Sequence, residues 1–394
     1  MALDMTVNRL PARTWNWLKM NESSLKDMEA RGSCFVKMEG SAAVDENGNA
    51  PEGPSAGVSG ELSEELCAGA KAEDGAGENG AEDEETDFSS IATGMGEDMD
   101  RLAAEADAST IRIFGGESSL HFQCKDGEKS FQRVEISAAA GETVTVIMDY
   151  TSDAHAAGLA AFQTRIMMDQ GAKVRLVQVQ LLGEGYTVLN DVGALCGDDA
   201  QLQVVQLFLG GEKTYGGCLA DLDGRGSGLD VTVGYLGRGH QAFDMNYEAL
   251  HRGKKTQSQM AVSGVLGDSA FKLFRGTIDF KLGSSGAKGD EKEDVLIMGD
   301  DAVNQTIPLI LCAEEDVEGN HGASIGRLDD ELLFYLCSRG MSEEAAGAMI
   351  SRARIDAVSR KIGHEETEKL VSDYLREVLG DGQPEDEDGG GQDR

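Results

Sequence analysis

Segments in which apolar and polar residues alternate recur through the middle of the chain. The clearest occupy residues 139–148, 169–180, 196–209, 226–236 and 266–280, each next to a turn containing glycine or aspartate. Alternation with a period of two predicts β-strands with one buried face. No helical pattern separates these segments, which argues against an α/β sheet of the Rossmann type.

The predicted strands repeat at a nearly constant interval. Val144, Val174, Leu202 and Val231, taken as equivalent positions, are 30, 28 and 29 residues apart. A fixed period in the range of about 20 to 50 residues indicates stacked repeats, because one repeat cannot bury its apolar face without its neighbours. We therefore expect a mainly β protein whose core, residues 106–323, is a β-solenoid of the parallel β-helix type. A β-sandwich of antiparallel hairpins is the alternative.

The spacing of apolar residues becomes helical over residues 324–380. Ser342 is a candidate N-cap, and the last predicted helix, about residues 365–379, carries an apolar stripe. Such a helical domain can cap a solenoid or dock a partner, and the sequence leaves both roles open. The stripe includes Leu370, Tyr374, Leu375 and Val378.

Acidic residues are concentrated before the predicted solenoid. Between Asp45 and Asp100 there are 17 acidic residues and one basic residue, Lys71. Such a composition cannot bury enough apolar surface to offset its conformational entropy, so we expect residues 45–105 to be a largely disordered insert. We also expect a disordered tail over residues 381–394. The N-terminal segment, residues 1–44, is predicted to be partly helical and to dock its two tryptophans, Trp15 and Trp17, on the body of the protein.

The overall charge excludes several classes of partner. The formal net charge is -36, which argues against nucleic acid and against anionic membranes. No apolar run approaches the length of about 18 residues that a membrane-spanning helix needs. The first 20 residues lack the apolar centre of a secretory leader, so we expect a cytoplasmic protein.

No motif in the chain indicates an enzyme. A phosphate-binding P-loop and a zinc-protease motif are both missing from the sequence. The six histidines are widely separated, and none of the seven cysteines forms a CxxC pair. We therefore expect the cysteines to be buried small hydrophobic residues in a reducing compartment, Cys312 and Cys337 among them.

Several motifs follow one another in fixed order from residue 295 onward. They are the Gln305–Pro308 turn, the run Asn320–Ser324, Gly326 with Leu328 and Asp329, and the block Leu333–Gly340. This segment resembles the C-terminal core of the SufB/SufD family of iron–sulfur cluster assembly scaffold proteins. The resemblance implies a right-handed parallel β-helix between helical ends.

Within that family the chain most resembles SufD-type subunits, and a divergent SufB is the alternative. SufB-type chains carry a cysteine where this chain has Ala302, and they have His-Glu where this chain has His321 followed by Gly322. SufD-type chains often have a cysteine two residues before the histidine, where this chain has Gly319. That departure weakens the case for a thiolate partner of His321.

The resemblance implies a function, partners and a site. The function is that of a non-catalytic scaffold that pairs with a SufB-like paralogue, or with itself, and docks a SufC-like ATPase of the ABC type. The docking candidates are Leu370, Tyr374, Leu375 and Val378. His321 is the candidate cluster-assembly residue and metal ligand, with a purely structural role as the alternative.

No cofactor is expected to be bound permanently, although an iron–sulfur cluster can form transiently in the complex. The alternative function is a cytosolic acidic β-solenoid that binds proteins and is unrelated to iron–sulfur clusters.

Overall fold

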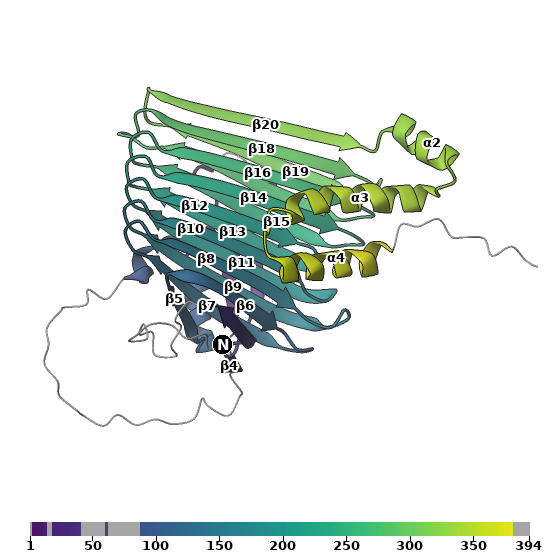
Figure 1. Ribbon diagram of the computed structural model, residues 1–394, viewed down its shortest axis with the longest axis horizontal. Helices are drawn as coiled ribbons and strands as arrows, with labels where there is room; N and C mark the ends of the chain where they lie inside the picture. The colour runs from purple at the N-terminus through teal and green to yellow at the C-terminus, as the bar shows by residue number, and fades with distance from the viewer. Residues whose placement is uncertain (1, 14–17, 41–59, 62–86, 381–394) are drawn as a thin grey trace, which may run out of the picture.

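Two parallel β-sheets lie face to face and form the body of the protein (Figure 1). The structure is a computed structural model that describes residues 2–13, 18–40, 60–61 and 87–380. Most of the predicted acidic insert, the predicted tail and both tryptophans lie outside these residues. Successive strands alternate between the two sheets, so each turn of the chain adds one strand to each sheet. The described chain is therefore the expected β-solenoid with two strands per coil.

The larger sheet contains ten described strands. In spatial order they are β20 (Val317–Arg327), β18 (Ala287–Ile297), β16 (Gln257–Leu266), β14 (Gly228–Gly237), β12 (Gln201–Phe208), β10 (Lys173–Leu181), β8 (Thr143–Thr151), β6 (Gly116–Gln123), β3 (Phe35–Gly40) and β4 (Gly60–Glu61). The second sheet contains eight described strands. They are β19 (Val303–Cys312), β17 (Phe271–Phe280), β15 (Ala242–His251), β13 (Lys213–Leu222), β11 (Gly185–Cys196), β9 (Ala157–Met168), β7 (Lys129–Ala138) and β5 (Thr110–Phe114).

The strand register tests the predicted repeat. Val174 pairs with Val144 on one side and with Leu202 on the other, as the intervals of 30 and 28 residues predict. The next step differs by two residues, because Leu202 pairs with Leu229 rather than with Val231. A shift of two residues keeps the same face of the strand buried, so the apolar pattern hides it. These parallel ladders exclude the sandwich of antiparallel hairpins.

Alternate side chains from both sheets fill the interior of the solenoid. Three aromatic rings stack there, with the centroids of Tyr150 and Phe162 3.9 Å apart and Phe122 packed edge-on against Phe162. All three side chains are fully buried. Because each ring packs against the coil next to it, the coils stabilise one another along the whole stack.

Two helices cover the outer face of the larger sheet (Figure 1). Ile355 and Val371, one from each helix, pack on outward-facing side chains of the strands, such as Val177 and Leu207. A third and shorter helix precedes them. The helices are α2 (Asp330–Ser338), α3 (Glu343–Ser359) and α4 (Glu365–Leu379).

The N-terminal segment covers the outer face of the second sheet. The prediction that this segment is partly helical is wrong for the described residues, which form the antiparallel pair β1 (Leu3–Val7) and β2 (Ser23–Met28). Leu3, Met5 and Val7 are buried and alternate with more exposed residues, so the segment lies on the sheet as a strand. Helix α1 (Asp98–Ala106) packs in the same cluster.

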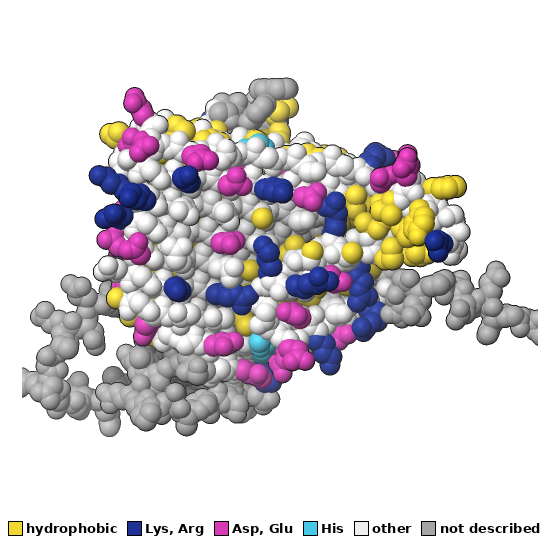
Figure 2. All heavy atoms as spheres, turned by 45° about the horizontal axis from the view of Figure 1, so that its top comes forward, with side chains coloured by type: hydrophobic (Ala, Val, Ile, Leu, Met, Phe, Trp, Pro, Cys, Tyr) yellow, Lys and Arg dark blue, Asp and Glu magenta, His cyan; other side chains and the backbone are white. Residues whose placement is uncertain are grey.

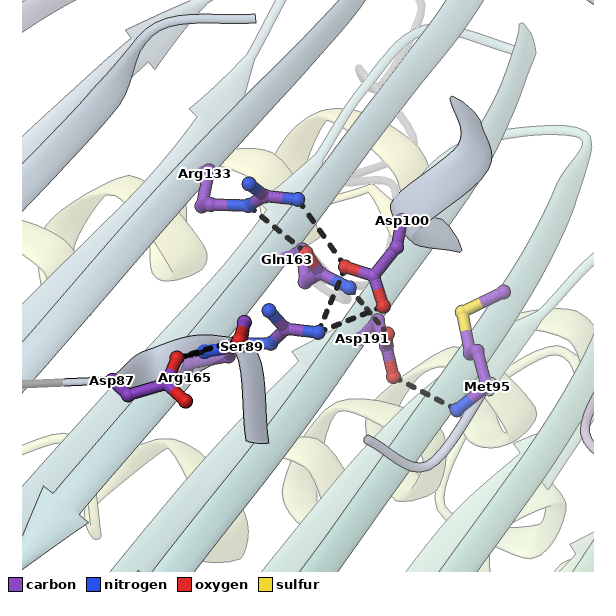
Figure 3. A network of polar contacts seen from close by, with 8 residues as sticks. All are labelled: Asp87, Ser89, Met95, Asp100, Arg133, Gln163, Arg165 and Asp191. Carbon is purple, nitrogen blue, oxygen red and sulfur yellow. Dashed lines mark hydrogen bonds and ion pairs between the residues drawn. The ribbon is translucent and has the colours of Figure 1, made fainter. Parts of the chain in front are cut away.

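One end of the predicted acidic insert is packed rather than disordered. Residues 87–105 lie on the second sheet, with Met99 buried. Figure 3 shows how polar contacts fix this segment: Asp100 accepts two hydrogen bonds of 2.8 Å from Arg165, and Asp191 accepts one of 2.8 Å from the backbone of Met95. The sequence allows short helical pieces over residues 88–99, and the structure has a 3₁₀ turn at Phe88–Ser90 and α1 from Asp98 onward.

The two ends of the solenoid differ. At the N-terminal end β3 runs antiparallel to β6 and closes the larger sheet together with β4. At the C-terminal end β19 and β20 are the outermost strands of their sheets, and no described strand pairs with their outer edges. We call this second end the open end. Strand β20 continues to Arg327, past the predicted boundary at residue 323.

Candidate functional site

His321 lies in the middle of β20, at the open end. It pairs in register with Glu291 of β18, and its Nδ1 atom is 3.2 Å from Oε1 of Glu291. Glu291 is buried, as are the alternate residues Gly289 and Glu293, which places this face of β18 inside the solenoid. The His321 side chain is 25% exposed. It therefore covers a buried carboxyl group while remaining accessible from the open end.

A buried ionic cluster lies beside Glu291. Lys272 of β17 forms an ion pair with Glu293, and its Nζ atom also donates a hydrogen bond of 2.9 Å to Oγ1 of Thr306. The Thr306 hydroxyl donates a hydrogen bond of 2.7 Å to the second oxygen of Glu293. Lys272 and Glu293 are fully buried. Since each charged group has partners, the cluster satisfies the requirement for burying charge inside a protein.

Glu291 is the least satisfied member of this group. Burial raises the pKa of its carboxyl group to about 8; Glu293 adds to the rise and Lys272 opposes it. Its Oε1 atom has no hydrogen-bond partner among the described residues, although His321 is near. Gly276 faces it from the second sheet, where a Cβ atom would lie 2.2 Å from Oε2 of Glu291. The structure thus keeps space for a carboxyl group that turns its free oxygen toward His321.

Two cysteines that were expected to be buried are accessible. Cys312, the last residue of β19, is exposed, and Cys337 on α2 is half-buried. The prediction for Cys312 is wrong because, in the described part of the chain, no coil stacks beyond β19 to cover it. By contrast, Cys34, Cys124, Cys196 and Cys218 are buried, as expected. Burial raises the pKa of the Cys196 and Cys218 thiols to about 12, which keeps them unreactive.

The four ATPase-docking candidates on α4 do not share one environment. Leu375 is fully buried against the solenoid, and Val378 packs partly buried in the same cluster. The Tyr374 hydroxyl donates a hydrogen bond of 2.7 Å to the carbonyl oxygen of Leu209. Leu370 is 37% exposed. The stripe therefore packs mainly against the larger sheet, and Leu370 is the one exposed residue among the four candidates.

Sequence reasoning found His321 and Thr306 but missed Lys272, Glu291 and Glu293. One signal was present: β18 carries charged residues on both of its alternating faces, in contrast to the apolar inner positions of the preceding strands. A charge at a position that the repeat assigns to the interior indicates a buried polar site.

Comparison with known proteins identifies the family. Residues 121–354, which span most of the solenoid and the start of the C-terminal helices, match the SUF system FeS cluster assembly, SufBD core domain. The chain belongs to the SufBD family. The resemblance seen in the C-terminal motifs is thereby confirmed, and the match extends through the repeated strands.

Individual SufBD relatives are distant. The chain is 29% identical over 252 residues to the iron-sulfur cluster assembly protein SufD of Bacillus subtilis. The aligned region covers 63% of this chain and 57% of that protein. It is 26% identical over 257 residues to a SufBD family protein of Staphylococcus saprophyticus, covering 64% of this chain and 55% of the relative. The chain thus spans little more than half the length of these curated relatives. Among the described residues, no helix has the length and apolar character needed to cross a membrane.

Proposed function

We propose that the chain is a non-catalytic scaffold subunit of a SUF-type iron–sulfur cluster assembly complex. The observation that carries the proposal is the open end, where His321 lies on an outermost strand above the buried Glu291. A ligand on a strand whose outer edge has no described partner can be joined by groups from a second chain. Family membership supports this function over an acidic binding module unrelated to iron–sulfur clusters.

The partner at the open end is, in this proposal, a SufB-like paralogue or a second copy of the chain. An outermost strand offers a row of unpaired backbone groups for pairing with another chain. Apolar side chains are exposed beside it, including Ile310 on β19, Ile325 on β20 and Phe334 on α2, the last being 76% exposed. Figure 2 shows hydrophobic side chains gathered toward the α2 end of the molecule. Burying this surface would contribute to association through the hydrophobic effect.

His321 is proposed to contribute its imidazole to the nascent cluster, which is the cargo of the complex. A neutral imidazole is a suitable ligand for iron. The nearby Glu291 carboxyl group would orient the ring from behind, as hydrogen-bonding groups behind a metal ligand do. The Lys272–Glu293–Thr306 cluster would hold Glu291 in place from the adjoining strands. The alternative role of His321 is a contact that only stabilises the subunit interface.

The C-terminal helical domain is proposed to dock a SufC-like ATPase. Leu375 and Tyr374 contact the solenoid and are not available to a partner. The proposed docking surface is therefore the outward side of α3 and α4. Leu370 and Met349 are its exposed apolar residues, 37% and 39% exposed.

Co-purification tests the proposed function. The full chain would be co-expressed with the SufB-like paralogue and the SufC-like ATPase of its own genome, and iron and sulfide would be measured in the isolated complex. The proposal predicts a complex of defined stoichiometry that acquires a cluster when iron, a sulfur source and a reductant are supplied. A chain that purifies alone in this experiment, without either partner, would contradict it.

A further inference from the structure

A second group of metal-ligand side chains lies far from the open end, where α4 meets the N-terminal end of the larger sheet. It contains Glu39 of β3, His121 of β6 and Glu366 in the first turn of α4. One ligand atom of each residue lies within 4.8 Å of one ligand atom of each of the others. The three residues are separated widely in sequence, so the fold alone brings them together.

The histidine of this group is oriented by a buried carboxylate. Asp149 is the register partner of His121 on the neighbouring strand β8, and its Oδ2 atom is 2.6 Å from Nδ1 of His121. The Asp149 side chain is only 3% exposed. Since Nδ1 is engaged, Nε2 is the ring nitrogen that remains to bind a ligand. Histidine ligands of metals are commonly held in this way, with a carboxylate behind the ring that fixes the tautomer and raises the basicity of the other nitrogen.

The charges around His121 suit a divalent cation. Glu39, Glu366 and Asp149 carry three negative charges, and among the described residues Lys37 forms an ion pair with Glu39, its Nζ atom 2.6 Å from Oε1 of Glu39. With a neutral imidazole, an ion of charge two would balance the group. Two carboxylates and one imidazole are ligand types that Zn²⁺ and similar transition-metal ions accept.

We propose that Glu39, His121 and Glu366 form a binding site for a divalent transition-metal ion, and that the ion fastens α4 to the N-terminal end of the solenoid. Tetrahedral Zn²⁺ requires ligand atoms about 3.4 Å apart, so the groups must close slightly around the ion. Glu366 is exposed and its side chain can make that adjustment. Three protein ligands leave a fourth position for water.

Zinc titration of the metal-free full-length chain tests the site. Isothermal titration calorimetry at pH 8, followed by metal analysis after gel filtration, would measure affinity and stoichiometry. We expect one equivalent of Zn²⁺, with affinity at least 10-fold lower in His121→Ala and in Glu366→Gln. Asp149→Asn should lower the affinity by roughly 10- to 100-fold, the usual effect of removing a group behind a metal-bound histidine.

Matched variants separate this site from other zinc ligands. Glu365→Gln removes the same charge from the same helical turn, and His155→Ala removes a histidine that is 91% exposed; both should leave the affinity unchanged. Absence of a stoichiometric equivalent, or an equivalent that survives both His121→Ala and Glu366→Gln, would overturn the proposal. Because Glu366 is exposed, its variant remains informative even if His121→Ala destabilises the fold.

Hydrogen exchange gives a second readout. Zn²⁺ should slow amide exchange in residues 365–379 of the wild-type chain, since the ion joins α4 to β3 and β6. The same addition should have no effect in Glu366→Gln. Equal slowing in both proteins would mean that zinc binds elsewhere.

Discussion

His321 and Glu291 lie opposite each other on the last two strands of the larger sheet, with Nδ1 3.2 Å from Oε1. The imidazole is partly accessible and the carboxyl group is buried. This relationship places an imidazole at the surface of the open end and a buried carboxyl group behind it, which is the basis of the first prediction.

Replacing His321 by alanine should remove most of the cluster-forming capacity of the complex. A histidine that only makes a hydrogen bond contributes on the order of 1 kcal/mol, so folding and subunit stoichiometry should survive the change. The measurement is iron and sulfide content of the purified complex after reconstitution, with His155→Ala as the control. Normal cluster content at normal stoichiometry would leave His321 with a structural role only.

The open end should lose its partner when charge is introduced there. Ile325→Asp places a carboxylate on the outermost strand, where the free chain can hydrate it but a buried interface cannot. We expect the melting temperature of the free chain to change little and binding of the paralogue to weaken at least 10-fold. Leu282→Asp is the control, because Leu282 is 83% exposed and lies on the turn between β17 and β18 rather than on β20. Equal binding by the two variants would exclude β20 from the interface.

The buried ion pair should be sensitive to the loss of one partner. Lys272→Met leaves Glu293 without its cation in the interior and should lower the free energy of unfolding by about 3–5 kcal/mol. Replacing both residues, as in Lys272→Met with Glu293→Gln, should recover part of this loss because no unpaired charge remains. Denaturant unfolding of Lys272→Met, of Glu293→Gln and of the double variant gives the coupling free energy between the two residues. Additive losses would show that the pair does not act as a unit.

Helix α4 should depend on its inward residues for stability. Leu375→Ala removes a fully buried side chain and should cost about 2–5 kcal/mol, which thermal or denaturant unfolding would detect. Leu370→Ala should change the free energy of unfolding by less than about 0.5 kcal/mol. The second variant instead tests ATPase docking, and a pull-down with the ATPase should show weaker capture. Unimpaired capture would move the docking surface away from Leu370.

Asp191 should give the protein a pH-dependent stability. Burial raises the pKa of this carboxyl group from 3.8 to about 6, so between these values the folded chain retains a proton that the unfolded chain has lost. The free energy of unfolding should therefore fall as pH rises from about 4 to about 6, by an amount on the order of 3 kcal/mol, and this contribution should be constant above that range. Subtracting the pH profile of Asp191→Asn from that of the wild type isolates the contribution. A difference profile with no slope in this window would contradict it.

The solenoid was predictable because several strands of the larger sheet show simple alternation. Strands β8, β10, β12 and β14 carry the 28- to 30-residue pattern that led to the repeat. In the second sheet, β17 was found within residues 266–280, but most strands were not, because a strand such as β11 buries both faces. Val188 points into the interior and Leu189 into the cluster under the N-terminal segment. Burial on both sides removes the period of two from the sequence.

The N-terminal strands were missed for a different reason. The alternation of Leu3, Met5 and Val7 spans only five residues, too few to distinguish a strand from a helix. Their partner strand begins at Ser23, and the surface they cover belongs to strands more than one hundred residues later, such as β9. Tertiary contacts of this range decide the structure and leave no local pattern.

The candidate site was predicted only at the residue that carries a motif. His321 was found through the motif, whereas Lys272 and Glu291 lie on other strands and become its neighbours only when the coils stack. The exposure of Cys312 could not be predicted either, since it depends on the absence of a following coil in the described chain.

The unequal ends of the solenoid limit the number of chains that can join in this way. Antiparallel β3 interrupts the parallel stacking at the first end, so a further coil cannot be added there in register. If open ends join to open ends, the union uses the β19 and β20 edges of both chains, and growth through these edges ends with two subunits rather than a filament. Each chain would then have one partner at its open end. A pair would share one interface, and the ligand residues of the two chains would meet at one place in it.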